Sequence, residues 1–117
     1  MTKKKETEGK EFLFGIKDRL MIPQLTPTNG NYLDLLTAKH IDRKVEFSSE
    51  ELEKYNIRSG GNGGIIWDFE KEEQKKIFLT TLEISLLQKQ IEELGNQNKL
   101  HKDMVDTLEK IMIDNAG

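Results

Sequence analysis

Residues 63–94, GGIIWDFEKEEQKKIFLTTLEISLLQKQIEEL, decide the predicted fold. Apolar, β-prone residues at 65–69 and at 76–79 predict two short strands. The connector between them, residues 70–75, is wholly charged or polar, which is typical of a solvated hairpin loop. The stretch therefore predicts a β-hairpin that runs directly into a helix.

The start of that helix is marked by Thr80 and Glu83, which have the spacing of a capping box. Apolar residues recur at helical spacing from Leu82, and Gly95 is the predicted end of the helix.

A last helix follows a short polar turn at residues 96–99. Two helices joined so closely are expected to form an antiparallel helical hairpin. Both helices carry more apolar positions than one inner seam can cover, so we predict a homodimer through the C-terminal helices. The extra positions are Ile84, Leu86, Met104 and Met112.

Upstream of this region, alternating apolar residues at 12–16 give a weak signal for a third strand. Helical spacing begins at Ile16, but Pro23 either ends that helix near Met21 or kinks it, because proline removes a backbone hydrogen bond.

Two further helices are predicted in the middle of the chain. Residues 32–45 carry a broad apolar face, and Ser48 with Glu51 forms a second capping box at the start of a short helix. The glycine-rich segment 59–64, SGGNGG, is predicted to be a flexible connector.

The predicted fold class is α+β: a small antiparallel sheet of two strands, or three with 12–16, packed with four to five helices and ending in the helical hairpin.

Composition sets the limits of the domain. The 117 residues fit one domain, predicted over 11–117, preceded by a flexible, charged tail at 1–10. The net charge is −3 and there is no cysteine, so neither a global attraction to nucleic acid nor a disulfide or thiolate site is predicted. No apolar run is long enough to span a bilayer and no secretion signal is seen, so we expect a cytoplasmic protein without membrane contact.

The sequence contains no recognisable catalytic pattern. The segment 59–64 lacks the Lys-Ser/Thr ending and the strand-to-helix context of a phosphate loop. His40 and His101 have no carboxylate at zinc-site spacing. We therefore predict no enzyme activity, no cofactor and no metal.

Trp67 and Phe69 are the candidate binding residues. On a strand they share one side, and Trp67 is predicted to anchor the core beneath the helical hairpin. The alternative is that they form an exposed aromatic surface for a protein partner, because tryptophan is enriched at interfaces.

The order of three helices and a hairpin also matches a winged helix. Its third helix, at residues 49–55, is acidic, so it would repel phosphates. DNA binding would have to use a basic helix side instead, formed by Lys39, Arg43 and Lys44.

Several stretches resemble a group of small tailed-phage and prophage proteins that have no agreed activity. They are 14–35 (FGIKDRLMIPQLTPTNGNYLDL), 47–58 (FSSEELEKYNIR), 65–69 (IIWDF) and 95–111 (GNQNKLHKDMVDTLEKI). The resemblance covers most of residues 14–113, with departures at Pro23 and at 96–98. It implies a phage or prophage origin and carries no mechanism.

The favoured functional prediction is a non-enzymatic protein-interaction module with a host or phage protein as its partner. The alternative is a winged-helix-like regulator that binds nucleic acid. Because the net charge is negative and the third helix acidic, nucleic acid is the less expected partner.

Overall fold

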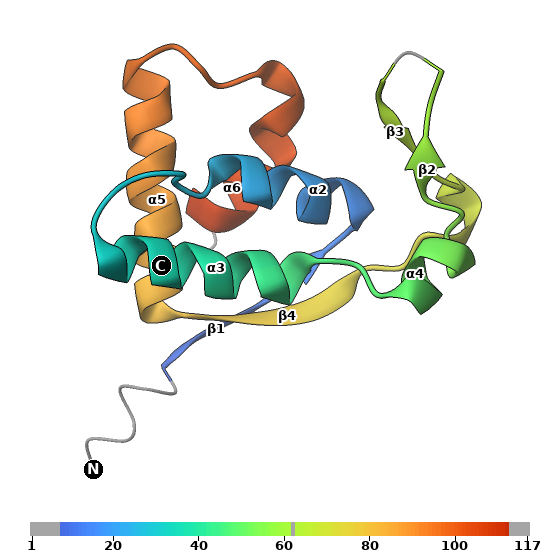
Figure 1. The fold of residues 1–117 in the computed structure, drawn as a ribbon, viewed down its shortest axis with the longest axis horizontal. Helices are drawn as coiled ribbons and strands as arrows, with labels where there is room; N and C mark the ends of the chain where they lie inside the picture. Colours follow the sequence, from blue (N-terminus) through green and yellow to red (C-terminus); the bar gives the residue numbers. More distant parts are fainter. Residues whose placement is uncertain (1–7, 62, 113–117) are drawn as a thin grey trace.

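The computed structural model describes residues 8–61 and 63–112 and confirms the α+β class (Figure 1). The strands are β1 (Gly9–Phe14), β2 (Arg58–Ser59), β3 (Ile65–Ile66) and β4 (Lys75–Thr80). The helices are α2 (Ile16–Leu25), α3 (Tyr32–Val45), α4 (Ser49–Lys54), α5 (Thr81–Asn96) and α6 (Val105–Met112). Two 3-10 turns, η1 (Phe69–Lys71) and η2 (Lys102–Met104), complete the list.

The strands pair differently from the prediction. Residues 65–69 do not pair with residues 76–79; instead β4 pairs with β1 in an antiparallel sheet, from Gly9 opposite Thr80 to Phe14 opposite Lys75. The predicted hairpin is therefore wrong. The weakly signalled N-terminal strand does exist and is one half of the main sheet.

The glycine-rich segment explains the change of partner. It joins β2 to β3 as the loop of a small hairpin, in which the Gly60 N–H donates to the Gly64 carbonyl at 2.6 Å. Gly63 has a φ of +86°, a conformation that glycine adopts without strain. Because β3 finds its partner across this loop and η1 follows soon after, the charged connector closes no hairpin. The β2–β3 hairpin stands out from the helices as a small arm (Figure 1).

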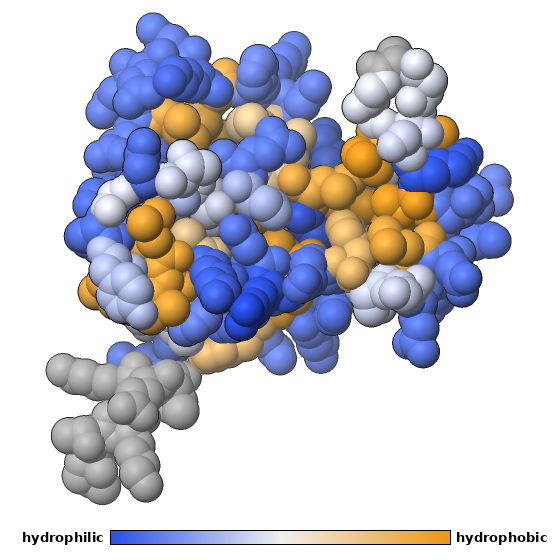
Figure 2. Space-filling view, in the orientation of Figure 1, coloured by the Kyte–Doolittle hydropathy of each residue, from blue (hydrophilic) through white to orange (hydrophobic). Residues whose placement is uncertain are grey.

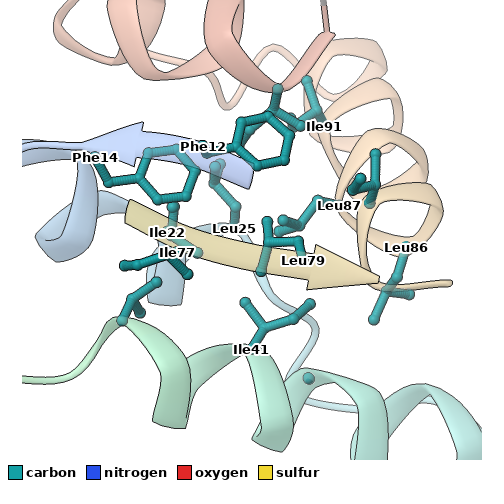
Figure 3. Close-up of a cluster of buried hydrophobic side chains, with 14 of the residues drawn as sticks. Phe12, Phe14, Ile22, Leu25, Ile41, Ile77, Leu79, Leu86, Leu87 and Ile91 are labelled. Carbon is teal, nitrogen blue, oxygen red and sulfur yellow. The ribbon is translucent and has the colours of Figure 1, made fainter. Parts of the chain in front are cut away.

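One face of the β1–β4 sheet carries the core (Figure 3). Phe12, Phe14, Ile77 and Leu79 alternate with exposed residues and are each 5% exposed or less. The rings of Phe12 and Phe14 stack at 5.2 Å between centroids. Helices α2, α3 and α5 cover this face with buried side chains, among them Ile22, Leu25, Ile41, Leu86, Leu87 and Ile91.

Lysine side chains bond to both strands of this sheet. The Lys110 Nζ donates to the Leu13 carbonyl of β1 at 2.8 Å, and the Lys44 Nζ donates to the Phe78 carbonyl of β4 at 2.9 Å. Charged side chains at strand edges discourage the addition of another strand. The sheet therefore stays two-stranded.

Helix α2 continues through Pro23 to Leu25, so an end near Met21 is wrong. Proline costs about 3 kcal/mol inside a helix. On either side of it, however, Ile22 and Leu25 are almost fully buried, and burying such side chains stabilises the fold by about 1.5–3 kcal/mol each. Tertiary packing thus outweighs the local penalty.

Both predicted capping boxes are confirmed. The Thr80 hydroxyl accepts from the Glu83 N–H at 3.2 Å, and the Glu83 carboxylate accepts from the Thr80 N–H at 2.9 Å. Ser48 and Glu51 make the same pair of bonds at 3.1 and 3.0 Å. The starts of α4 and α5 follow directly from sequence.

The predicted helix end at Gly95 is wrong by a short distance, because α5 runs to Asn96. After the helix, Asn98 adopts a left-handed conformation with a φ of 58°. The Lys99 N–H then donates back to the Leu94 carbonyl at 2.8 Å. Asparagine tolerates this conformation better than most residues, so it replaces glycine as the terminator.

The apolar flanks that motivated the homodimer are mostly covered within one chain. Ile84, Leu86 and Met104 are buried, at 2%, 5% and 8% exposure, and Met112 packs against the core. Helices α5 and α6 contact each other, and the Gln88 amide donates to the Ile111 carbonyl at 3.1 Å. The flanks therefore no longer require a second copy.

The boundary of the predicted tail also moves. Strand β1 begins at Gly9, so the folded region starts before residue 11. Residues 1–7 of that tail lie outside the described residues.

The pairing of β1 predicts a sharp contrast between two neighbouring substitutions. Phe14→Ala removes a ring that is 0% exposed and should lower the free energy of unfolding by about 3–5 kcal/mol. Leu13→Ala, on the opposite face at 49% exposure, should cost less than about 1 kcal/mol. Urea denaturation followed by circular dichroism measures both. Equal losses would contradict the register of β1.

Candidate functional site

A cleft lies where the start of α2, helix α6 and the segment after β3 meet. Its volume is about 740 Å³ and it is open to solvent. It is lined by Gly15, Lys17, Asp18, Trp67, Phe69, Glu72, Gln74, Asp106, Glu109 and Lys110. Both aromatic residues singled out from the sequence are among them.

Trp67 and Phe69 stand at the wall of this cleft rather than in the core. Trp67 is half-buried and absent from the core cluster, so its predicted role beneath the helical hairpin is wrong. Phe69 lies on η1 and is 74% exposed. The two rings meet at 5.1 Å between centroids with a tilt of 57°, so they form an aromatic corner.

Glu72 fixes the aromatic corner to the start of α2. One of its carboxylate oxygens accepts from the Trp67 indole N–H at 3.1 Å, and the other accepts from the Ile16 backbone N–H at 2.8 Å. A Cβ on Gly15 would lie 2.6 Å from the same carboxylate, so glycine is what allows this approach. The position of Trp67 is thus set by a helix N-terminus, where a negative charge is stabilised.

Asp18 joins the opposite wall to the same helix. Its buried carboxylate accepts from the Gly15 N–H at 2.9 Å, from the Lys110 Nζ at 2.7 Å, and from the Thr107 hydroxyl. Thr107 is 1% exposed and Lys110 lies on the same helix. These bonds hold α6 against α2 and so fix the width of the cleft.

The rim of the cleft carries charged side chains that take no part in these hydrogen bonds. Asp106 and Glu109 are exposed on α6, and Lys17 is exposed on α2. Within residues 8–61 and 63–112, none of the three makes an ion pair or a side-chain hydrogen bond. The rim is therefore available to a ligand.

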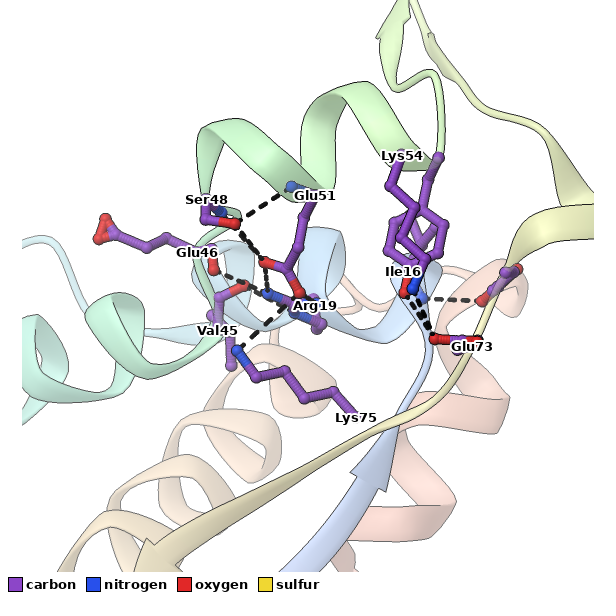
Figure 4. Close-up of polar contacts among 11 residues, drawn as sticks. Ile16, Arg19, Val45, Glu46, Ser48, Glu51, Lys54, Glu73 and Lys75 are labelled. Atoms are coloured by element: carbon purple, nitrogen blue, oxygen red, sulfur yellow. Dashed lines mark hydrogen bonds and ion pairs between the residues drawn. The ribbon is translucent and has the colours of Figure 1, made fainter.

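A second polar cluster fixes α4, the helix that precedes the β2–β3 arm (Figure 4). The Arg19 guanidinium is 2% exposed and donates two hydrogen bonds of 2.9 Å to the Glu51 carboxylate of α4. It also donates to the carbonyls of Val45 and Glu46, at 3.1 and 2.8 Å, and lies over the Phe47 ring at 4.1 Å. Such a two-pronged arginine pair fixes orientation as well as distance.

This pairing controls the charge of Glu51. Because the Arg19 guanidinium donates to its carboxylate, the pKa of Glu51 falls from 4.5 to about 2, against the opposing effect of burial. At the end of α4, the Lys54 Nζ and the Tyr55 hydroxyl donate to the Glu73 carboxylate at 3.1 and 3.3 Å, and the Lys54 bond lowers the pKa of Glu73.

The basic residues of the alternative prediction do not form one surface. The Lys44 Nζ is held by Glu83 at 2.7 Å and by the Phe78 carbonyl, on the sheet side of α3. Lys39 and Arg43 line a different hollow, of about 460 Å³, which they share with two carboxylates, Asp42 and Glu46. Helix α4 buries none of its residues, so it is not seated on the core as a recognition helix would be. The geometry does not favour DNA binding, which stays a prediction.

The structure brings few other chemical groups together. Among the described ranges, no three His, Asp or Glu side chains are placed to hold a metal ion, and both histidines are exposed. No helix in that part of the chain is long and apolar enough to cross a membrane. Figure 2 shows hydrophobic side chains gathered below the tip of the β2–β3 arm, and smaller hydrophobic patches on the opposite side of this face, where α3 and α5 lie.

Several residues of the cleft could not be singled out from the sequence. Asp18 carries one usable signal, since an acidic residue three places after Gly15 is typical of a helix start. Glu72 carries none, because Glu70 and Glu73 beside it look the same. In the sequence, Asp106 and Glu109 look like ordinary surface residues. Only the fold shows that they line the same cleft as Trp67.

The pKa of Glu51 predicts how stability depends on pH. Its folded pKa is depressed from 4.5 to about 2, so the stability that its charge contributes is present above pH 4.5 and is lost as the pH falls toward 2. Glu51→Gln keeps a capping side chain but loses the charge, and should destabilise the protein at pH 7 much more than at pH 2. Chemical denaturation at both pH values measures this, with the exposed Glu50→Gln as the control.

A destabilisation by Glu51→Gln that is the same at both pH values would contradict this assignment of the charge.

Comparison with known proteins adds no relative. No protein-family model, no curated protein and no solved structure matches this chain.

Proposed function

We propose that this chain is a non-enzymatic protein-interaction module of a bacteriophage or prophage. It acts in the cytoplasm of a bacterial host by binding one host or phage protein, and the contact is made at the cleft of Trp67 and Phe69. The phage origin rests on the sequence resemblance described above. The site rests on the geometry of the cleft.

The observation that carries the proposal is the exposure of Phe69 beside Trp67. Phe69 is 74% exposed, so most of its ring lies in water, and it is not part of the core cluster. Aromatic side chains are enriched at the centres of protein interfaces, where a few of them supply most of the binding energy. The aromatic corner has the composition and the position of such an anchor.

The shape of the site favours a macromolecular ligand. The cleft is open to solvent, whereas small-molecule sites enclose most of their ligand. Its walls come from three separate parts of the chain, and hydrogen bonds fix each of them, so little order has to be gained on binding. A protein segment that lies along the cleft would contact both rings and the rim charges together.

The homodimer is a separate proposal, and the burial of Ile84, Leu86 and Met104 removes its original reason. Among the described residues, α5 and α6 still expose Leu82 at 52% and Val105 at 44%, and these are the remaining candidates for a contact between copies through the C-terminal helices. A light-scattering mass near 13.5 kDa at micromolar concentration would exclude the dimer.

Replacing Phe69 should strongly reduce partner capture without unfolding the protein. Because the ring is exposed, Phe69→Ser should change stability by less than about 1 kcal/mol. Loss of an aromatic anchor should reduce the captured partner about tenfold or more. The measurement is affinity capture from a lysate of the host bacterium, quantified by mass spectrometry for wild-type and variant baits.

Tyr32→Ser is the matched control for this experiment. Tyr32 is 79% exposed on α3 and does not line the cleft, so its loss should leave capture unchanged. Proteins held equally by all three baits do not use the cleft. If every captured protein behaves in that way, the proposed site is wrong.

A further inference from the structure

We infer that the cleft accepts an arginine side chain of the partner, placed over the aromatic corner of Trp67 and Phe69 and facing the carboxylates of α6. This inference rests on the proposed function, because it names the chemistry of the segment that the interaction module would bind.

The charge of the lining supports a cationic occupant. The cleft is lined by four carboxylates, Asp18, Glu72, Asp106 and Glu109, and by two lysines, Lys17 and Lys110, which gives a formal charge of 2 − 4 = −2. The Lys110 charge is already paired within the chain, since its Nζ lies 2.7 Å from the Asp18 carboxylate and 2.8 Å from the Leu13 carbonyl. The groups on α6 that remain free are both acidic.

The spacing of those two acids suits one ligand. Asp106 and Glu109 are three residues apart on α6, so their side chains lie on the same side of the helix. Asp18 and Thr107 hold that helix in place beneath them. Together the two carboxylates can accept from several of the five N–H groups of one guanidinium.

The aromatic corner supplies the second half of the recognition. A cation over an aromatic face is stabilised by the negative charge of that face, and arginine, being planar, also stacks on it. The chain itself uses this contact elsewhere, where the Arg19 guanidinium lies 4.1 Å from the centroid of the Phe47 ring. Rings together with nearby carboxylates select a cation over an apolar side chain, which would leave those carboxylates without a partner.

Lys17 gives the inference an unusual test. It is exposed at the rim and makes no ion pair within the described part of the chain, so its positive charge opposes a cationic ligand. Removing that charge should therefore improve binding. A purely structural role of Lys17 would not predict tighter ligand binding after its replacement.

The probe is acetyl-Gly-Arg-Gly-amide, titrated into the full chain while the fluorescence of Trp67 is recorded. Trp67 is the only tryptophan in the sequence, so the signal comes from the cleft itself. The control peptide carries citrulline, which keeps the shape of arginine and loses its charge. We expect a saturable change with the arginine peptide up to about 10 mM, weaker at higher salt, and no such change with citrulline.

Three variants complete the design. Lys17→Gln should strengthen binding of the arginine peptide about twofold or more, and the double variant Asp106→Asn/Glu109→Gln should weaken it about fivefold. The matched control is Glu92→Gln/Glu93→Gln, which removes the same charge from exposed positions of α5 outside the cleft. It should bind as the wild type does once the salt concentration is moderate.

Equal binding of the citrulline peptide, no binding of the arginine peptide, or equal weakening by the α5 control would each overturn the inference. These outcomes are separable from a failure of the proposed function. Capture of a protein that depends on Phe69 but not on Asp106 and Glu109 would keep the interaction module and exclude an arginine anchor. Arginine binding without any Phe69-dependent capture would keep the site and exclude the proposed module.

Discussion

Two adjacent charged residues, Asp18 and Arg19, are buried in the first turn of α2, and a buried charge must be fully satisfied to be tolerated. On a helix, neighbouring side chains point in different directions. Asp18 therefore faces α6, where Lys110 and Thr107 bond to it, and Arg19 faces the start of α4, where Glu51 bonds to it. One helical turn thus fixes two distant parts of the chain.

The cleft is a product of this arrangement. The Asp18 bonds set one wall by holding α6, and the Arg19 bonds set the position of the arm through α4. Glu72 then ties the aromatic segment back to the Ile16 N–H at the same end of α2. Among the described residues, every buried side-chain nitrogen and oxygen has a partner, so the polar frame is complete. Loss of Lys110 or of Glu51 would leave Asp18 or Arg19 as a buried charge without its ion-pair partner.

Sequence patterns were sufficient wherever a signal was local. Capping boxes at Ser48 and Thr80 predicted the starts of α4 and α5 correctly, because both partners of each box lie within one turn. The period of the apolar residues found the strands but not their pairing. The alternation at 76–79 shows that one side of this strand is buried, but it does not indicate whether β1 or β3 pairs with the strand. Only the whole core decides this, because Phe12 and Phe14 supply the rings that face Ile77 and Leu79.

Long-range contacts, which local sequence patterns do not reveal, also determine where the candidate site and Phe69 lie. Its turn is held on both sides: the Asp68 N–H donates to the Tyr55 carbonyl at 2.9 Å, and the Glu72 N–H donates to the Phe69 carbonyl at 3.2 Å. An exposed ring on a mobile loop would lose conformational freedom when it bound a partner, and this would oppose binding. Here folding has already ordered the backbone around Phe69, so that opposing term is reduced before any partner arrives. The hydrogen bonds that look purely structural in this segment are therefore the ones that make its exposed aromatic surface suitable for binding.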